Sequence, residues 1–353
     1  MQIFVRADSS TDIGTGHIMR CLALAKQLRK MSFCVEFISK KLDGNVTELV
    51  KKNGFKIHYL DKKITTKKSL NIDSEQTINK IIKNSKIPPF LIVDHYNLDI
   101  KWEKKLRVYV KKIIVIDDLA NRKHDCDLLI DQNFYNNLKN RYNKLIPKKT
   151  IKLLGPEYAM LRDEFLRYRK RVKPRKKFKK LLISFGGTDP TNETKKVLES
   201  IKILKNKKLE RIYVITGSTN KNKIKQLCNS IPNARLYHNV ENIAKIMYKS
   251  DFAIGAGGST IWERACLGLP TYVSMVASHQ KETTNALARK KYLINTGMAR
   301  LISKKKYAKI LDDINEKELE RISKNSLKIV DGKGGGRVAN NIKKLYKMSM
   351  ENE

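Results

Sequence analysis

The sequence lacks any long hydrophobic run, and none approaches the roughly 18 apolar residues that a membrane-spanning helix needs. The N-terminus, Met1 to Arg6, reaches a charge too soon to contain the apolar core of a secretory signal. Paired cysteine motifs are also missing, which disfavours disulfides and a zinc site. The five cysteines are scattered: Cys21, Cys34, Cys126, Cys228 and Cys266. We therefore expect a cytoplasmic protein without a structural metal.

Acidic residues are scarce: 35 Asp and Glu stand against 74 Lys and Arg, giving a formal net charge of +39. Clustered cations bind nucleic acids, but here most are spread along helix faces, as in a lysine-rich proteome. In the densest stretch, Arg167 to Lys180, 10 of 14 residues are basic, without the interleaved aromatics of a nucleic-acid groove. No nucleic-acid partner is expected. Attraction of an anionic substrate, an acidic membrane surface or a pathway enzyme stays open.

The length of 353 residues, with 41% hydrophobic and 31% charged residues, favours two globular domains. Short β-branched runs alternate with amphipathic stretches, which indicates βαβ units and parallel sheets. We predict strands at these positions: Ile3–Val5, Cys34–Ile38, Lys56–Tyr59, Phe90–Val93, Lys112–Ile116, Leu128–Ile130, Leu181–Ser184, Arg211–Ile215, Ala234–Tyr237, Phe252–Ile254 and Thr271–Val273.

The helices between these strands are predicted from amphipathic spacing. They cover 18–30, 158–170, 192–205, 222–230, 241–249, 260–267, 280–290, 316–329 and 337–349. The fold class is therefore α/β, with two Rossmann-like domains whose strand ends face a shared cleft. The predicted division is an N-terminal domain at 1–170, an exposed basic linker at 171–180, a C-terminal domain at 181–330, and a last helix at 331–353 that packs back across the domain junction.

The loop after the first strand is a candidate site. Gly14 and Gly16 let the backbone turn sharply before the first helix. The order Gly-x-Gly-His matches neither a dinucleotide fingerprint nor a P-loop, so no cofactor is expected. His17 would lie in the first turn of the helix, where the dipole keeps it neutral and able to accept a proton. A capping or packing role for His17 is the alternative, and Arg6 with Asp8 could be an ion pair or a sugar contact.

A second cluster, Asp94-His95-Tyr96, directly follows a strand. Nearby loops hold Asp117-Asp118, His124 to Asp127 and Asp131 to Asn133, but their spacing fits no dedicated metal motif. Ordinary turn chemistry explains them better than a metal site does.

Two glycine-rich turns follow strands of the second half: Ser184 to Pro190 and Ile254 to Glu263. Backbone N–H groups of such turns suit a pyrophosphate. Glu263, one turn into its helix, could accept hydrogen bonds from ribose hydroxyls, or it could simply be a favourably placed acid in a first helical turn.

These residues resemble a known family. The chain contains an ordered set of motifs: Gly14-x-Gly16-His17-Ile18-x-Arg20, Asp94-His95-Tyr96, His124-x-Cys126-Asp127, Gly155-x-x-Tyr158-Ala159-x-x-Arg162-x-Glu164-Phe165 and Phe185-Gly186-Gly187-Thr188-Asp189, followed by Glu241 to Ala244 and Glu263. Together, these motifs are similar to those of the UDP-2,4-diacetamido-2,4,6-trideoxy-β-L-altropyranose hydrolases of pseudaminic acid biosynthesis. Spore-coat polysaccharide proteins are related. The resemblance implies a glycosyltransferase-B-type fold and a role in supplying flagellin glycosylation.

The resemblance further implies that water attacks the anomeric carbon and cleaves the C1–O bond with inversion, releasing UDP. His17 matches the proposed base, Glu263 the ribose contact, and Ser278-His279-Gln280 a further contact, where His279 replaces an asparagine of one family member. The expected substrate contacts are Arg6, Asp8, Gly14, Gly16, Arg20, Tyr96, Arg162, His279 and Gln280. The expected nucleotide contacts are Gly186, Gly187, Thr188, Gly258, Ser259, Thr260 and Glu263.

The expected mechanism needs one base and neither a covalent nucleophile nor a metal, because UDP is already a good leaving group. Two other functions stay open. An inverting UDP-sugar glycosyltransferase would use the same base on an acceptor hydroxyl, and the fold does not separate the two reactions. A noncatalytic binder of anionic glycans or nucleic acid would use the basic surface and would not need His17.

Overall fold

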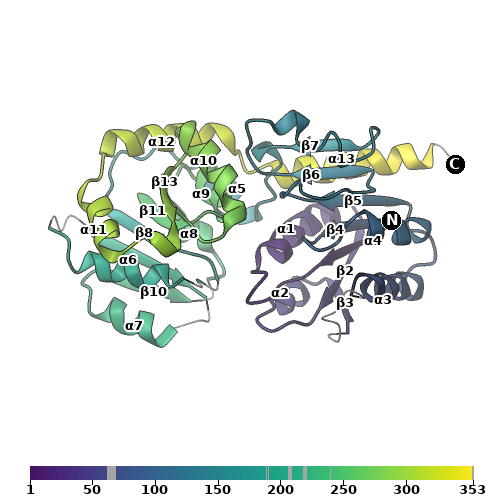
Figure 1. Cartoon of the computed structure of the whole chain (residues 1–353), viewed down its shortest axis with the longest axis horizontal. Helices are drawn as coiled ribbons and strands as arrows, with labels where there is room; N and C mark the ends of the chain where they lie inside the picture. The colour runs from purple at the N-terminus through teal and green to yellow at the C-terminus, as the bar shows by residue number, and fades with distance from the viewer. Residues whose placement is uncertain are drawn as a thin grey trace. The chain divides into compact units, whose positions relative to one another are not determined.

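The computed structural model of the chain describes residues 1–61, 69–187, 189, 191–205, 209–217, 221–238 and 240–351. The chain forms two compact units (Figure 1). The first contains Met1–Leu161 and Lys333–Glu353, and the second contains Arg162–Gly332. Each unit is built on one parallel sheet with helices beside it, so the predicted pair of Rossmann-like α/β domains is confirmed.

The first unit has a seven-stranded sheet in the order β3-β2-β1-β4-β5-β6-β7. Its strands are β1 Gln2–Ala7, β2 Cys34–Lys40, β3 Lys56–Leu60, β4 Phe90–Asp94, β5 Lys112–Ile116, β6 Leu128–Asp131 and β7 Ile151–Leu154. Its helices are α1 Gly16–Lys30, α2 Thr47–Lys52, α3 Ser69–Asn84, α4 Ile100–Leu106 and α13 Gly334–Met350. All six strands predicted for this half form, and β7 is an additional edge strand.

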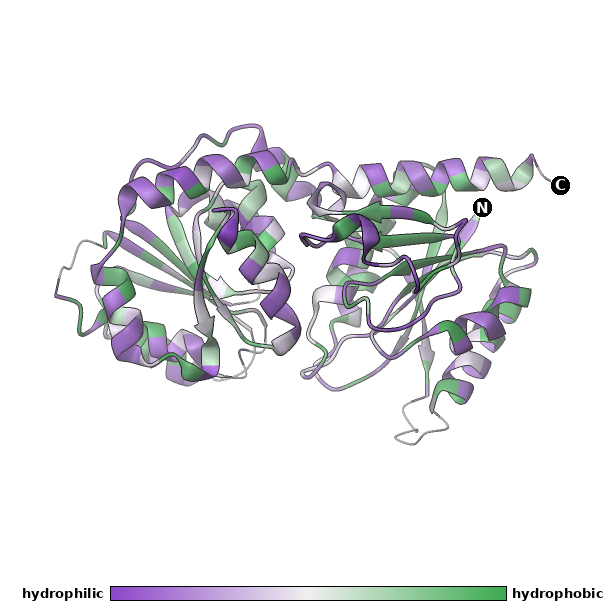
Figure 2. Cartoon of the chain, turned by 45° about the horizontal axis from the view of Figure 1, so that its top comes forward, coloured by the Kyte–Doolittle hydropathy of each residue, from purple (hydrophilic) through white to green (hydrophobic). Residues whose placement is uncertain are grey.

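Buried apolar residues alternate between the two faces of this sheet. In β1, Ile3 and Val5 join a core with α1, whereas Phe4 joins a separate core with Trp102 of α4. Successive side chains of a strand point to opposite faces, so a sheet covered on both faces requires continuous apolar strands. Figure 2 shows this pattern as largely hydrophobic strands and helices of mixed hydropathy.

The second unit has a six-stranded parallel sheet in the order β10-β9-β8-β11-β12-β13. Its strands are β8 Lys180–Ser184, β9 Arg211–Thr216, β10 Ala234–His238, β11 Phe252–Ala256, β12 Thr271–Met275 and β13 Ile294–Met298. Its helices are α5 Asp163–Arg169, α6 Glu193–Ile201, α7 Lys221–Asn229, α8 Ile243–Lys249, α9 Thr260–Cys266, α10 Lys281–Arg289, α11 Lys304–Asp312 and α12 Glu316–Ile329. The sequence did not predict β13 or α11.

The last helix, α13, belongs to the first unit. It packs on α1, and Val338, Ile342 and Leu345 enter the core that also contains the first strand. Near its start, a Cβ built on Gly334 would lie 2.3 Å from the carbonyl oxygen of Ala159, so only glycine allows this backbone approach. The tail therefore has its own docking site within the first unit.

The boundary after the first unit lies at Leu161, earlier than the predicted boundary at residue 170. Helix α5 joins the second unit because it packs on α8 and α9. The predicted exposed linker at 171–180 is also part of the second unit. Within it, Arg175 Nε donates to the carbonyl of Ser250 at 3.0 Å, and Phe178 is buried in the core. Dense positive charge therefore did not identify a free linker.

Candidate active site

The loop after β1 approaches the point where the strand order reverses between β1 and β4, which is where open α/β sheets bind ligands. Gly14 N donates to the carbonyl of Ser10 at 2.9 Å, and Gly14 has a φ of 80°, which favours glycine. The loop closes on itself and α1 begins at Gly16. His17 therefore lies in the first turn of α1, as predicted.

His17 is only 5% exposed and lies between two residues of the cluster that follows β4. Its Nδ1 is 3.8 Å from Asp94 Oδ1, which is beyond hydrogen-bond distance. Nδ1 is buried and has no hydrogen-bond partner among the described residues. The ring packs edge-on against Tyr96, with 4.6 Å between centroids. An orphaned buried polar atom is uncommon, and here it faces a carboxylate that a small movement would bring within reach.

Arg20 fixes that carboxylate. Its Nε and Nη2 each donate to Asp94 at 2.6 Å, forming a bidentate pair, and its Nη1 donates to Asp118 at 2.9 Å. Cys21 Sγ also lies 3.4 Å from Asp94. Arg20 was predicted as a substrate contact, but in the structure its guanidinium holds the acid beside His17.

The electrostatics leave His17 neutral and Asp94 charged. Burial lowers the pKa of His17, although the negative charge of Asp94 acts in the opposite direction. Burial alone would raise the pKa of Asp94, but the adjacent Arg20 overrides it and lowers that pKa to about 2. A neutral imidazole beside an ionised carboxylate is the arrangement that a general base requires.

Arg6 and Asp8 form the ion pair that the sequence left open as one alternative. Arg6 has no exposed surface, and it donates to Asp8 at 2.6 Å and to Asp73 at 2.7 Å. Lys40 approaches Asp73 at 2.9 Å. The network joins β1, β2 and α3 beneath the loop, so the predicted direct contact between Arg6 and a sugar is contradicted by its burial.

His95 has a different role from its neighbours Asp94 and Tyr96. Its Nδ1 accepts from the backbone N–H of Asn97 at 3.0 Å, so the ring proton is on Nε2, which lies 3.2 Å from Asp8 Oδ2. His95 therefore completes the buried network around Asp8. The three consecutive side chains at the end of β4 form two groups: Asp94 and Tyr96 lie beside His17, and His95 lies beside Asp8.

The acidic loops after β5 and β6 form a buried polar network. The Oη of Tyr142 lies 3.2 Å from Asp117 Oδ2 and 3.0 Å from Asp131 Oδ2, and His124 lies 2.6 Å from Glu103. Burial raises the pKa of Asp131 to about 8. Across the described ranges, no group of three His, Cys, Asp or Glu side chains has an arrangement that could hold a metal ion.

In the second unit, the two glycine turns lie at the carboxyl ends of the adjacent strands β8 and β11. Gly186 has a φ of 89°. A Cβ on Gly217 would lie 1.8 Å from the carbonyl oxygen of Gly187, and one on Gly255 would lie 2.3 Å from that of Ser184. The backbones thus approach more closely than side chains would allow. Thr188, one of the predicted nucleotide contacts, lies outside the described residues.

Gln280 lies next to the second glycine turn. Its Oε1 accepts from the backbone N–H of Val276 at 3.0 Å. A Cβ on Gly257 would be 3.0 Å from that Oε1, and one on Gly258 would be 3.8 Å from Nε2. Ser259 and Thr260 continue from the turn into α9. His279 precedes Gln280 in a short turn of 3-10 helix.

Glu263, in the first turn of α9, is paired with Arg162. Arg162 Nη2 donates to Glu263 at 3.0 Å, and its Nη1 lies 3.2 Å from Glu164. Burial alone would lower the pKa of Arg162, but the negative charges of Glu263 and Glu164 raise this pKa above its ordinary value. Two predicted ligand contacts thus contact each other within the second unit.

The sequence did not identify three residues of these sites: Asp94, Asp118 and Arg264. Asp94 and Asp118 belong to polar clusters that are visible in the sequence. Their pairing with Arg20 could not be predicted, because it spans 74 and 98 positions of the chain. Arg264 gave no signal, because it follows Glu263 in a helix where a basic residue is ordinary. It is 1% exposed and donates to the carbonyl of Ala256 at 2.6 Å.

The chain is similar in sequence to several known proteins. The chain is 30% identical to a UDP-2,4-diacetamido-2,4,6-trideoxy-β-L-altropyranose hydrolase of Campylobacter jejuni, over 83% of this chain and 98% of that protein. It is 30% identical to an uncharacterized protein of Methanocaldococcus jannaschii, over 80% of this chain but only 57% of that protein. It is 22% identical to the spore coat polysaccharide biosynthesis protein SpsG of Bacillus subtilis, over 99% of this chain and all of that protein.

Residues 181–333 match the glycosyltransferase family 28 C-terminal domain. Among solved structures, MurG of Acinetobacter baumannii is similar, with a TM-score of 0.67 at 14% identity over 98% of this chain and all of that one. The S. aureus MnaA–UDP structure has a TM-score of 0.64 at 14% identity over 98% of this chain and 97% of that one. These likenesses, with the two parallel sheets, confirm the predicted glycosyltransferase-B-type fold.

Proposed function

The chain belongs to the family of UDP-2,4-diacetamido-2,4,6-trideoxy-β-L-altropyranose hydrolases, and from this premise we propose that it hydrolyses a UDP-linked amino sugar of that class. It is an enzyme that processes nucleotide sugars. The product of the proposed reaction is the free sugar for pseudaminic acid biosynthesis, together with UDP. The observation that carries the proposal is His17, a buried neutral imidazole at a strand-end loop with an ionised carboxylate beside it.

The proposed chemistry is one displacement. Water attacks C1 of the sugar, the C1–O bond to UDP breaks, and the bonding pair leaves with the diphosphate, so the configuration at C1 inverts. Because Nδ1 of His17 faces Asp94, Nδ1 carries the ring proton and Nε2 accepts the proton from water. Asp94, held by Arg20, then stabilises the imidazolium that forms.

Sugar contacts are assigned to the first unit and nucleotide contacts to the second. Gly14 and Gly16 precede His17 in the chain, and Tyr96 packs against its ring. Arg20 acts through Asp94, and Asp8 acts through Arg6 and His95. The two turns after β8 and β11 offer backbone N–H groups to the diphosphate. They contain Gly186, Gly187, Gly258, Ser259 and Thr260.

Glu263 is proposed to bind the ribose, with Arg162 holding its carboxylate in place. Gln280 borders the second turn and Val276, so it supports the same nucleotide contacts. His279 is proposed as a neighbouring contact. No group in this scheme needs a metal ion, since the leaving diphosphate is stabilised by backbone donors.

The second candidate is an inverting glycosyltransferase, which the match to the glycosyltransferase family 28 C-terminal domain favours. The same base would then deprotonate an acceptor hydroxyl. The two reactions differ in whether UDP appears when water is the only nucleophile.

The test is UDP release from a panel of UDP-amino sugars with no acceptor added. Wild type should release UDP, and His17→Ala should lose about 10²- to 10⁴-fold in kcat, the usual contribution of a general base. His58→Gln is a matched control, because His58 lies in β3 and pairs with Glu36. Release only after adding a sugar acceptor would replace the hydrolase by the transferase, and full activity of His17→Ala would remove the assigned base.

A further inference from the structure

Arg264 is a buried cation behind the second glycine turn. It lies in α9, one residue after Glu263, and is 1% exposed. Its Nη2 donates to the carbonyl of Ala256 at 2.6 Å, whereas Nε and Nη1 have no hydrogen-bond partner among the described residues. Its acidic neighbour Glu263 is paired with Arg162 instead. Within the described part of the chain, the guanidinium thus has one hydrogen bond and no ion pair that would neutralise it.

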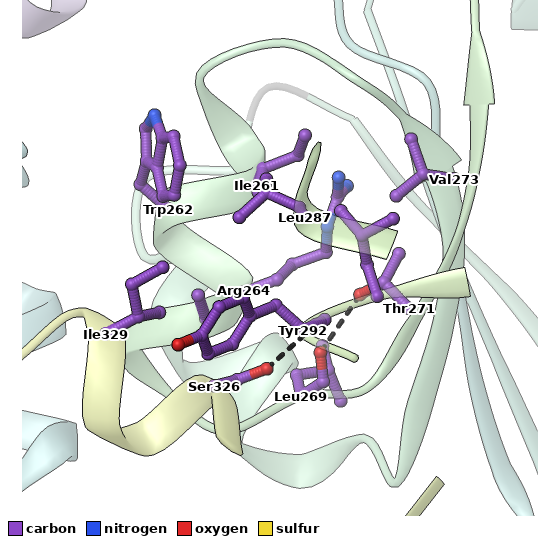
Figure 3. A pocket seen from close by; sticks show the side chains of 12 residues that line it. Ile261, Trp262, Arg264, Leu269, Thr271, Val273, Leu287, Tyr292, Ser326 and Ile329 are labelled. Carbon is purple, nitrogen blue, oxygen red and sulfur yellow. Dashed lines mark hydrogen bonds between the residues drawn. The ribbon is translucent and has the colours of Figure 1, made fainter. Parts of the chain in front are cut away.

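The side chains around Arg264 are mainly apolar, and the negative charge of Glu263 offsets the effect of burial only in part. A small cavity of about 10 Å³ beside it is lined mainly by apolar side chains, among them Ile261, Leu269, Val273 and Leu287 (Figure 3). Burying an unpaired charge is costly, and an apolar residue of similar size commonly serves such a position as well or better. Burial lowers the pKa of Arg264 to about 10, which still leaves it charged at neutral pH.

The guanidinium of Arg264 lies against the backbone of the second glycine turn. A Cβ built on Gly255 would lie 2.6 Å from Nη1, so the charge lies directly against the backbone that enters the turn. Nη2 fixes the carbonyl of Ala256. In a trans peptide the N–H points opposite to the C=O, so the N–H of Gly257 is aimed away from Arg264. Arg264 therefore orients the backbone N–H of Gly257 and places a positive charge behind it.

We propose that Arg264 is a positioning residue that stabilises the diphosphate of a bound nucleotide through the 255–258 turn, without touching the ligand. The inference rests on the proposed function, because it takes that turn as the diphosphate site. A positive charge within several ångströms in a poorly solvated environment attracts an anion more strongly than in water. Its effect grows with the number of phosphates and is absent for an uncharged nucleoside.

The experiment compares uridine, UMP and UDP binding by calorimetry at low salt. Arg264→Gln should weaken UDP binding about tenfold or more, UMP binding less, and uridine binding less than about twofold. Arg264→Lys keeps a charge and should retain most of the preference for UDP over uridine. Arg169→Gln is the matched control, because Arg169 also donates to a backbone carbonyl of the second unit, that of Leu327. Thermal unfolding checks that each variant is folded.

The outcomes separate the two claims. Equal weakening of uridine and UDP by Arg264→Gln would mean a purely structural arginine and would overturn this inference alone. If Arg264→Gln does not fold, a folded Arg264→Lys that loses the preference for UDP would also overturn it. A wild-type protein that binds uridine but gains nothing from the phosphates would contradict the turn as a diphosphate site. Failure to bind either ligand would contradict the proposed function itself, and this inference with it.

Discussion

At the scale of the residue, the proposed hydrolysis depends on one buried histidine, His17. The sequence predicted that His17 would start a helix beside a strand-end loop, because glycines and a preceding apolar strand are local signals. It did not predict that Asp94 would face Nδ1, since β1 and β4 become neighbours only when the sheet forms. Nor did it predict the burial of Arg6, whose partner Asp73 is 67 positions away.

The burial of His17 predicts the pH dependence of the reaction. Because burial lowers the pKa of His17 below its ordinary value of 6.5, the base is neutral throughout the physiological range. We expect kcat/KM to fall toward acidic pH with a midpoint below 6.5, because the reaction loses its base as His17 becomes protonated. UDP release measured from pH 5 to pH 9 checks this.

Unfolding temperatures at each pH separate loss of the base from loss of the fold. A midpoint of activity above 6.5 would contradict the neutral buried imidazole. An acid limb that persists in His17→Ala at its residual rate would assign the titration to another group.

At the scale of the element, most strands were predictable and the two edge strands β7 and β13 were not. All eleven predicted strands lie within observed ones. Central strands such as β4 and β5 are buried on both faces and are therefore nearly continuous apolar runs. By contrast, β13 contains Asn295, Thr296 and Gly297 in a sequence with little apolar character. It is a strand because it pairs with β12, which is a tertiary effect that local propensity does not contain.

Helix α13 provides a matched pair of substitutions. Gly334→Ala should destabilise the protein by about 1–3 kcal/mol or more, because the new Cβ would meet the carbonyl oxygen of Ala159 at 2.3 Å. Gly336→Ala should stabilise it by about 0.5–1 kcal/mol, because nothing lies within 4 Å and alanine favours helix. Denaturant unfolding of both variants measures the difference. Equal effects of the two substitutions would contradict the close docking of this helix.

At the scale of the whole molecule, the fold class was predicted and the division of the chain was not. Alternating strands and helices specify two parallel sheets, but composition misplaced the boundary: the basic segment at 171–180 belongs to the second unit. The tail returns to the first unit. Among the helices of the described part of the chain, none combines the length and the hydropathy of a membrane span.

The return of the tail predicts an asymmetric effect of truncation. A chain ending at Gly332 loses Val338, Ile342 and Leu345 from the core of the first unit. At about 1.5–3 kcal/mol for each fully buried side chain, the loss approaches the whole stability of a domain. Calorimetry should show that the first unit no longer unfolds cooperatively, while the transition of the second unit remains. Two unchanged transitions would contradict the assignment of α13.

The central claim is that water attacks the anomeric carbon of a UDP-linked amino sugar with His17 as the base. Reaction in ¹⁸O-labelled water, followed by mass spectrometry of both products, tests it most directly. We expect one label in the free sugar, none in UDP, and a large loss of both products in His17→Ala. Label in the phosphate of UDP would show that a P–O bond breaks instead, and no turnover without an added acceptor would show that water is not the nucleophile.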